Sequence, residues 1–293
     1  MLRIADARTG RLVEIPSAHR HLLRICVHLP VIDNGIGAVH LRVLLLGDVL
    51  ARTAELRGLQ ALTVLTAPDL PQEQVQALDR VMAVLGIHPP ATVRAHDPSE
   101  SPSAAADVHV LAHGADQQAS VGGVRIDVGQ VATAPPEEGG PGSPDAVAPE
   151  GTDPLAVRMM LLGHAYRTPV MVTGAALVEA RRTLRNWRQL VADWAQEPSR
   201  PIPADLLRQA HAALADNLGY PAVLDTLRSV ERDAAWRGTR TCRPVPSSRR
   251  SPTLTASSGW TSRARSATST RRHHDLGRLP TPRRAAARQI RLA

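Results

Sequence analysis

A glycine turn that separates an apolar run from a helical pattern constrains the fold of this chain more than any other feature. The segment from Ile25 to Thr53 reads ICVHLPVIDNGIGAVHLRVLLLGDVLART, and Gly35 and Gly37 stand where the apolar run ends and helical spacing begins. Strand, glycine turn and helix in this order are how α/β proteins hold a phosphate at a helix N-terminus. The segment therefore predicts a nucleotide-binding α/β fold.

The residues around this segment repeat the alternation of strand and helix. Residues 22–32 and 59–67 read as buried strands, whereas 38–58 and 71–86 carry apolar residues at helical spacing. Elements that alternate at these lengths predict a parallel sheet with right-handed crossovers.

Composition divides the chain into four regions. We expect a shortened Rossmann-like nucleotide-binding domain over residues 1–132, a flexible linker rich in Pro, Gly and acids over 133–152, and an α-helical domain over 153–236. Residues 237–293 have no helical or strand period and are expected to be disordered. The abrupt change of composition at Arg237 also raises the hypothesis that the tail is a frame-shifted product.

The positive charge of the chain is confined to that tail. The net charge is +8, but residues 237–293 hold 14 Arg and one acid, whereas residues 1–236 hold 21 Arg and 26 acids. The tail can bind polyanions without specificity. The net negative charge of residues 1–236 does not indicate a folded nucleic-acid-binding domain.

Two missing residue types and the cysteine count narrow the chemistry. The chain contains no Lys, which excludes any mechanism that needs a lysine, and no Phe. Cys26 and Cys242 are far apart, so they do not form a disulfide framework, and they fit a reducing cytoplasm. Because the N-terminus lacks an apolar signal region and no apolar run can span a bilayer, we expect a cytoplasmic protein without a membrane partner.

A known enzyme family shares the order of several segments of this chain. The segments are LRIADARTGRLVEI, ICVHLPVIDNGIGAVHLRVLLLGDVL, LTVLTAPDLPQE, ALDRVMAVLGIHPPATVRAHD, DPLAVRMMLLGHAYRTPVMVTGAALVEARRTLRNWRQL and ALADNLGYPAVLDTLRSV. In this order they resemble the cysteinyl-tRNA synthetase family of class I and its relative, the cysteine ligase of mycothiol synthesis. The resemblance covers residues 1–95 and 153–231. It implies a Rossmann-like parallel sheet followed by an α-helical domain, and an ATP-dependent ligase that activates cysteine as cysteinyl-adenylate.

The resemblance implies a nucleotide site at Gly35, Gly37, His40 and Asp69. The family's H-I-G-H histidines hold the ATP phosphates, but the matching positions here read Gly35-Ile36-Gly37-Ala38. His40 is either a substitute for the missing histidines or a structural surface residue. The lysine of the family's K-M-S-K-S signature also has no counterpart, because the chain has no Lys. We therefore expect weak ATP binding and weak or absent adenylation.

The resemblance also implies a zinc site. The family's zinc is bound by two Cys, a His and an acid, and it binds the substrate thiol. Cys26 matches the first ligand and DVHVLAHGADQQ points to His113, but no cysteine matches the second ligand. Since zinc takes four ligands, we do not expect it to be tightly bound. In the alternative interpretation, Cys26 is a small buried apolar side chain, and His109 and His113 are ordinary polar residues at a strand end.

Two further functions compete with that of a weakened cysteine ligase. One is a non-catalytic regulatory or interaction module on the same fold, and the other is a cysteine:amino-sugar ligase of the mycothiol type. The substrates that the resemblance implies are ATP and cysteine, whereas tRNA as a partner stays open. The last point depends on a basic helix face that is either solvated or a tRNA contact, formed by Arg181, Arg182, Arg185 and Arg188.

Overall fold

The computed structural model describes residues 1–15, 21–32, 35–95, 106–114, 122–133, 152–196 and 201–240. Residues 1–232 form one compact unit, and a second unit begins at Asp233. Most of the expected linker (133–152) and of the expected tail (237–293) lies outside the described residues. The hypothesis that the tail is a frame-shifted product concerns these residues and therefore stays a hypothesis. Among the described helices, none combines the length and the apolar character that a membrane crossing requires.

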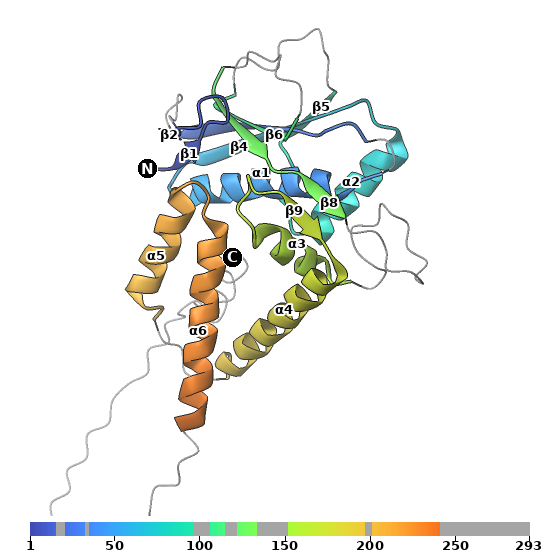
Figure 1. Cartoon of the computed structure of the whole chain (residues 1–293). Helices are drawn as coiled ribbons and strands as arrows, with labels where there is room; N and C mark the ends of the chain where they lie inside the picture. The colour runs from blue at the N-terminus through green and yellow to red at the C-terminus, as the bar shows by residue number, and fades with distance from the viewer. Residues whose placement is uncertain are drawn as a thin grey trace, which may run out of the picture. The chain divides into compact units, whose positions relative to one another are not determined.

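The centre of the fold is a parallel sheet of five strands (Figure 1). Its strands are β3 (Leu22–His28), β4 (Gln60–Ala67), β5 (Thr92–Ala95), β6 (Val108–Ala112) and β7 (Val124–Val128), and they lie in the order β5-β4-β3-β6-β7. Every neighbouring pair in this order is parallel. With α1 (Ala38–Leu56) and α2 (Gln72–Val84) as crossovers, the sheet confirms the expected Rossmann-like α/β fold.

One face of this sheet is apolar and packs against α1. Leu23, Ile25 and Val27 alternate along β3 and are almost fully buried. Gly47 of α1 lies so close to this face that a Cβ atom there would be 2.5 Å from Cγ2 of Val27. Because the crossovers from β3 to β4 and from β4 to β5 run in the same direction and are right-handed, α1 and α2 share this face.

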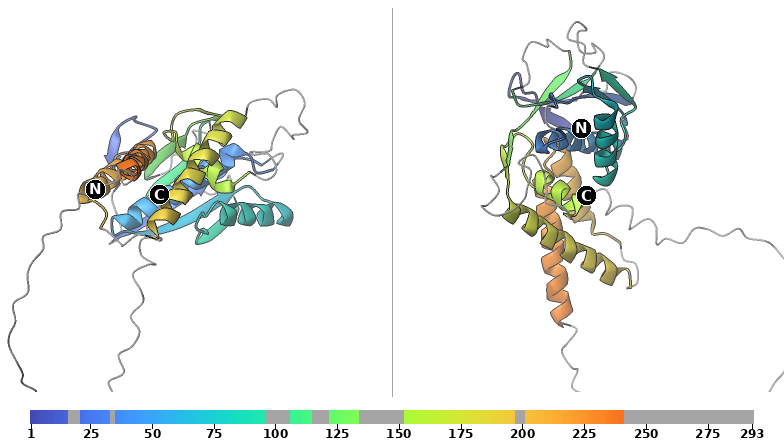
Figure 2. Two further views of the ribbon diagram at one scale, coloured as in Figure 1. Left: turned by 90° about the horizontal axis from the view of Figure 1, so that it is seen from below. Right: turned by 90° about the vertical axis from the view of Figure 1, so that its right-hand side faces the viewer.

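Within the first unit, which ends at residue 232, the helical segment lies on the far side of α1. It consists of α3 (Pro154–Leu162), β9 (Val170–Val172), α4 (Gly174–Trp194), α5 (Ala204–Ala215) and α6 (Tyr220–Arg240), and β8 (Val131–Thr133) pairs with β9 in parallel. In Figure 1, α1 separates α4 from the sheet, and α4 lies in front of α1 when seen from below in the left panel of Figure 2. A hairpin of β1 (Arg3–Ala5) and β2 (Leu12–Glu14) precedes the sheet.

Tyr166, in the HAYRTP segment, links the helical layer to the N-terminal hairpin. Its hydroxyl donates a hydrogen bond to Oδ1 of Asn217 at 2.6 Å, and the same oxygen accepts the backbone N–H of Ala5 at 2.9 Å. Burial raises the pKa of Tyr166 to about 12, so the hydroxyl stays protonated and keeps its donor role at neutral pH. Two segments that are far apart in the sequence therefore share one amide oxygen.

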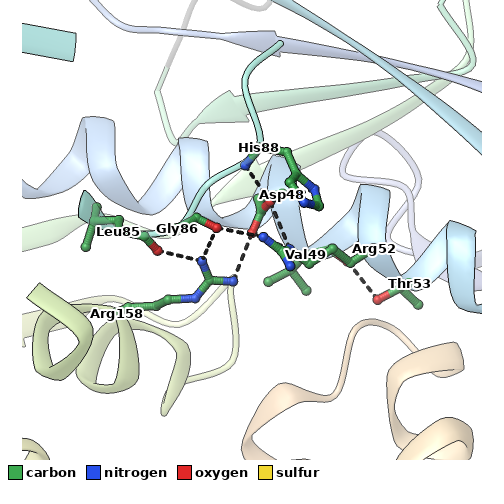
Figure 3. Close-up of polar contacts among 8 residues, drawn as sticks. All are labelled: Asp48, Val49, Arg52, Thr53, Leu85, Gly86, His88 and Arg158. Atoms are coloured by element: carbon green, nitrogen blue, oxygen red, sulfur yellow. Dashed lines mark hydrogen bonds and ion pairs between the residues drawn. The ribbon is translucent and has the colours of Figure 1, made fainter. Parts of the chain in front are cut away.

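A buried carboxylate, Asp48, connects α1 to α3 and to the end of α2 (Figure 3). It accepts hydrogen bonds from Nε of Arg52, from a guanidinium nitrogen of Arg158 at 2.9 Å and from the backbone N–H of His88 at 3.0 Å. Both guanidinium groups also donate to the carbonyl of Gly86, just beyond the end of α2. Positive groups at a helix C-terminus satisfy its last carbonyls and its dipole. Asp48 and its two arginine partners therefore hold α1, α2 and α3 together.

Arg42 is a second buried polar side chain of α1. Its side chain donates to the carbonyls of Gly129 and Ala165, each at 2.9 Å, and only 3% of the residue is exposed. Burial lowers the pKa of Arg42 to about 10, so the guanidinium is still charged at neutral pH. It holds the turn after β7 and the turn after α3 against the first helix.

Candidate functional site

The strand order places a candidate site at the carboxyl ends of β3 and β6. The chain leaves β3 toward β4 on one side, whereas β6 pairs with β3 on the other side. In open α/β sheets, ligands bind in the crevice at such a reversal of strand order, beyond the carboxyl ends of the strands. The glycine turn and the start of α1 follow β3 directly, so they belong to the same edge.

The glycine turn uses its two glycines for different purposes. Gly35 has a φ of +106°, which side chains rarely tolerate, so its backbone conformation requires glycine. Gly37 is the N-cap of α1 with an extended backbone, and a Cβ atom there would meet only Nδ1 of His40, at 3.7 Å. Gly37 is therefore not required by backbone strain, and its lack of a side chain leaves the helix start open to a ligand.

His40 closes the first turn of α1. Its Nδ1 accepts the backbone N–H of Gly37 at 2.9 Å, and its Nε2 lies 3.2 Å from the carbonyl oxygen of Val31. The interpretation of His40 as a surface residue is wrong, because the residue is only 6% exposed. The contact is one half of a capping box, in which the side chain of the third helical residue accepts the N–H of the N-cap residue. Both ring nitrogens therefore have protein partners and neither is directed to a ligand.

Asp69 is the remaining residue of the predicted nucleotide site. It is exposed and lies in the loop between β4 and α2. Because β3 and β4 are parallel neighbours, this loop leaves the sheet at the same edge as the glycine turn. The structure thus brings all four predicted nucleotide-site residues to one edge of the sheet.

A cluster of three metal-ligating side chains lies on the polar face of the same strands. Cys26 and His28 are two residues apart on β3, and His109 on β6 is the pairing partner of Cys26. They therefore project from the same face, opposite the face that packs on α1. One ligand atom from each lies within 4.8 Å of the others, and we name this set the Cys–His–His cluster.

Hydrogen bonds join members of the Cys–His–His cluster to each other and to β4. Nε2 of His28 is 3.0 Å from Nδ1 of His109, and the two rings are stacked with centroids 5.3 Å apart. Sγ of Cys26 is 3.3 Å from Oγ1 of Thr66. Burial raises the pKa of the Cys26 thiol, although Thr66 and Arg94 act in the opposite direction. The metal-free site thus contains one thiol and two stacked imidazoles.

His109 is the most unusual member of the cluster. It is 2% exposed, and burial lowers its pKa to about 4, against which the backbone of Gly122 favours the protonated ring. Its Nε2 is buried and makes no hydrogen bond of normal geometry to a described residue. Buried polar atoms without a partner are rare and ask for a physical explanation.

The Cys–His–His cluster differs from the zinc site that the resemblance implied. His113 is exposed beyond the end of β6 and is not a member of the cluster in the described residues. The interpretation of His109 as an ordinary residue at a strand end is wrong, because it is buried inside β6. Sequence reasoning missed His28, although the spacing C-x-H within a strand already places two ligands on one face.

Comparisons with known proteins agree with the resemblance over part of the chain. No known family profile matches the chain. An L-cysteine:1D-myo-inositol 2-amino-2-deoxy-alpha-D-glucopyranoside ligase of Streptomyces avermitilis is 37% identical over 91 residues, which are 31% of this chain and 20% of that protein. The corresponding ligase of Catenulispora acidiphila is 43% identical over 77 residues, 25% of this chain and 16% of that protein.

A second kind of relative is named as a ligase of cysteine and tRNA. The cysteine–tRNA ligase of Cereibacter sphaeroides is 40% identical over 74 residues, which are 25% of this chain and 14% of that protein. The chain thus spans a fifth or less of the length of these curated relatives. Over these matched segments, the chain is related to the cysteine ligases of both kinds, those that act on an amino sugar and those that act on tRNA by name.

Proposed function

We propose that the chain binds ATP weakly at the glycine turn and does not activate cysteine at a measurable rate. The observation that carries this proposal is the use of His40 as a helix cap, with both ring nitrogens in contact with backbone atoms. His40 was the residue that the sequence offered as a replacement for the missing signature histidines. Its ring is held by the protein instead.

The loss of catalysis follows from the donors that adenylation requires. Charge develops on the leaving pyrophosphate, and preorganised donors directed at that charge are usually the largest catalytic contribution. Removal of one such donor typically lowers kcat by about a hundredfold to a thousandfold. The two signature histidines and the signature lysine are all absent from this chain. The three losses are not additive, but even part of their sum leaves little activity.

Binding of the nucleotide depends on different groups and is less affected. The first N–H groups of a helix have no intrahelical acceptor, and together with the helix dipole they attract a phosphate. The N–H of Gly37 is already bonded to His40, so Ala38 and Val39 supply the donors at the start of α1. Two backbone donors without a cationic side chain support weak binding.

The proposal is tested by two measurements on the purified chain. Calorimetric titration with ATP is expected to give weak binding, and cysteine-dependent pyrophosphate exchange is expected to stay at background. Gly37→Val should abolish ATP binding without unfolding the protein, because the new side chain has room beside His40 but blocks the approach of the phosphate. Gly174→Val is the matched control, since it also changes an uncrowded glycine at the start of a helix, α4, and should not alter binding.

Robust pyrophosphate exchange by the wild-type chain would contradict the proposal. Such a result would have a clear follow-up, because the relatives have two acceptors in their names, an amino sugar and tRNA. Ligation of cysteine to the amino sugar, compared with charging of tRNA, would then decide between the two ligase types.

A further inference from the structure

We propose that Cys26, His28 and His109 form a site for one zinc ion, with three protein ligands and an open fourth position. This ligand set differs from the pair that the resemblance implied, Cys26 and His113. The proposal goes beyond ATP binding and does not depend on it, since zinc binding can be measured without nucleotide. It also changes the expectation of weak zinc binding, which did not count the imidazoles of His28 and His109 as ligands.

The spacing of the ligand atoms is close to that of a zinc site. Zn–S and Zn–N bonds of about 2.3 and 2.0–2.1 Å imply ligand atoms roughly 3.4–3.6 Å apart in a tetrahedral site. In the cluster, the two imidazole nitrogens are already 3.0 Å apart, and all three ligand atoms lie within 4.8 Å of one another. Small rotations of the side chains are therefore sufficient to accommodate the ion.

The backbone that carries the ligands is fixed by the sheet. Cys26 and His28 lie on the central strand β3, and His109 is in register with Cys26 on the neighbouring strand β6. Sites built on strands are held more exactly than sites on loops, and a preformed site loses little entropy on binding. The ligands do not need to be brought together by the metal.

The donor set suits zinc. A thiol and two imidazoles are sulfur and nitrogen ligands, which zinc prefers over the oxygen ligands of Mg²⁺ or Ca²⁺. Three protein ligands with a fourth position left open are typical of zinc sites that act on a bound molecule. When bound, a zinc ion supplies Lewis acidity to whatever occupies that position.

The position of His109 also favours a metal. Its Nδ1 faces His28, while its Nε2 is buried without a hydrogen bond of normal geometry among the described residues. A histidine that binds a metal through one nitrogen usually donates the other N–H to a carbonyl or carboxylate. The backbone of Gly122 acts on this ring in the direction of such an acceptor. Coordination of a metal by Nδ1 would leave the proton on Nε2, directed toward this backbone acceptor.

The test uses cobalt as a spectroscopic substitute for zinc in the full-length chain. A cobalt titration is expected to saturate at one ion per chain, with the intense near-ultraviolet band of a cobalt–thiolate bond and the visible bands of four-coordinate cobalt. Zinc should displace the cobalt and abolish these bands. Metal analysis after desalting should give one zinc per chain.

Four variants identify the ligands. Cys26→Ser should abolish the thiolate band, and His28→Gln should weaken cobalt affinity at least about tenfold. His28 is only half-buried, so this variant is expected to fold, whereas a change at His109 would leave a buried gap. Cys242→Ser and His113→Ala are the matched controls and should leave both the bands and the affinity unchanged.

The outcomes are separable. The proposal is overturned if the wild-type chain shows no thiolate band, or if Cys26→Ser binds cobalt as the wild type does. It is also overturned if His113→Ala abolishes binding and His28→Gln does not, because the ligand set would then be the one that the resemblance implied. Circular dichroism of each metal-free variant separates a lost ligand from a lost fold. None of these results depends on whether ATP binds.

Discussion

The two faces of the five-stranded sheet have different roles, although they alternate along the same strands. On β3, Ile25 and Val27 face α1 and are almost fully buried in the apolar core. Between and beyond them, Cys26 and His28 face the other way and meet His109 of β6. Parallel strands covered on both faces are usually apolar throughout. The departure from that pattern on one face marks the part of the sheet that is suited to chemistry.

The largest expected effect is on the apolar face. Ile25→Ala removes a fully buried side chain from the centre of the core, so the free energy of unfolding should fall by about 4 kcal/mol. Denaturant unfolding measures the change. Val31→Ala, at an exposed position of the same segment, is the control and should change stability by less than about 0.5 kcal/mol. Equal losses in the two variants would break the assignment of this face to the core.

The next effect concerns the buried carboxylate Asp48, on the helix side of the sheet. Asp48→Asn leaves the Arg52 and Arg158 guanidinium groups without their carboxylate, so unfolding should become easier by about 3 kcal/mol. Thermal and denaturant unfolding both report this loss. Asp205→Asn removes an exposed ion pair with Arg208 and should have almost no effect. If the Asp48 variant were as stable as wild type, the ion pairs of Asp48 would not hold the three helices together.

A smaller effect is expected from the contact between α1 and β3. Gly47→Ala places a methyl group 2.5 Å from Cγ2 of Val27, and we expect a loss of about 2 kcal/mol, since overpacking forces the helix away from the strand. A second change, Val27→Ala, should relieve part of the strain. The double-mutant cycle therefore measures the contact itself. A double variant that merely sums the two losses would contradict a direct contact.

The sequence predicted two strands of the sheet, β3 and β4, and the first helices, α1 and α2, because their signals are local. The apolar run before the glycine turn and the helical spacing after it fix β3 and α1 without knowledge of the rest of the chain. The strands β5, β8 and β9 were not predicted. β5 is exposed throughout, and β8 and β9 pair over only three residues that are far apart in the sequence. Such strands exist because of their partners rather than their own residues.

The candidate site was predictable in part for the same reason. Gly35 and Gly37 could be predicted from the sequence, because a turn before a helix has a local glycine pattern. The Cys–His–His cluster required the order of the strands, since β6 becomes the neighbour of β3 only when the chain crosses back over the sheet. The role of His40 as a helix cap was not predicted, because the sequence near a helix start does not distinguish a histidine that caps the helix from one on the surface.

The most direct test of the division between the two faces is the unfolding midpoint, measured with and without zinc in three proteins. In the wild type, zinc at a hundred times its Kd should stabilise the fold by about 2.7 kcal/mol. Ile25→Ala should lower the midpoint in the absence of metal and keep the zinc-induced increase. His28→Gln should keep the metal-free midpoint and lose at least about half of the increase, because a Kd that is about tenfold weaker leaves about 1.4 kcal/mol of stabilisation at the same zinc concentration. If His28→Gln lowered the metal-free midpoint as much as Ile25→Ala does, or if zinc stabilised it as it does the wild type, the assignment of stability to one face and metal binding to the other would be wrong.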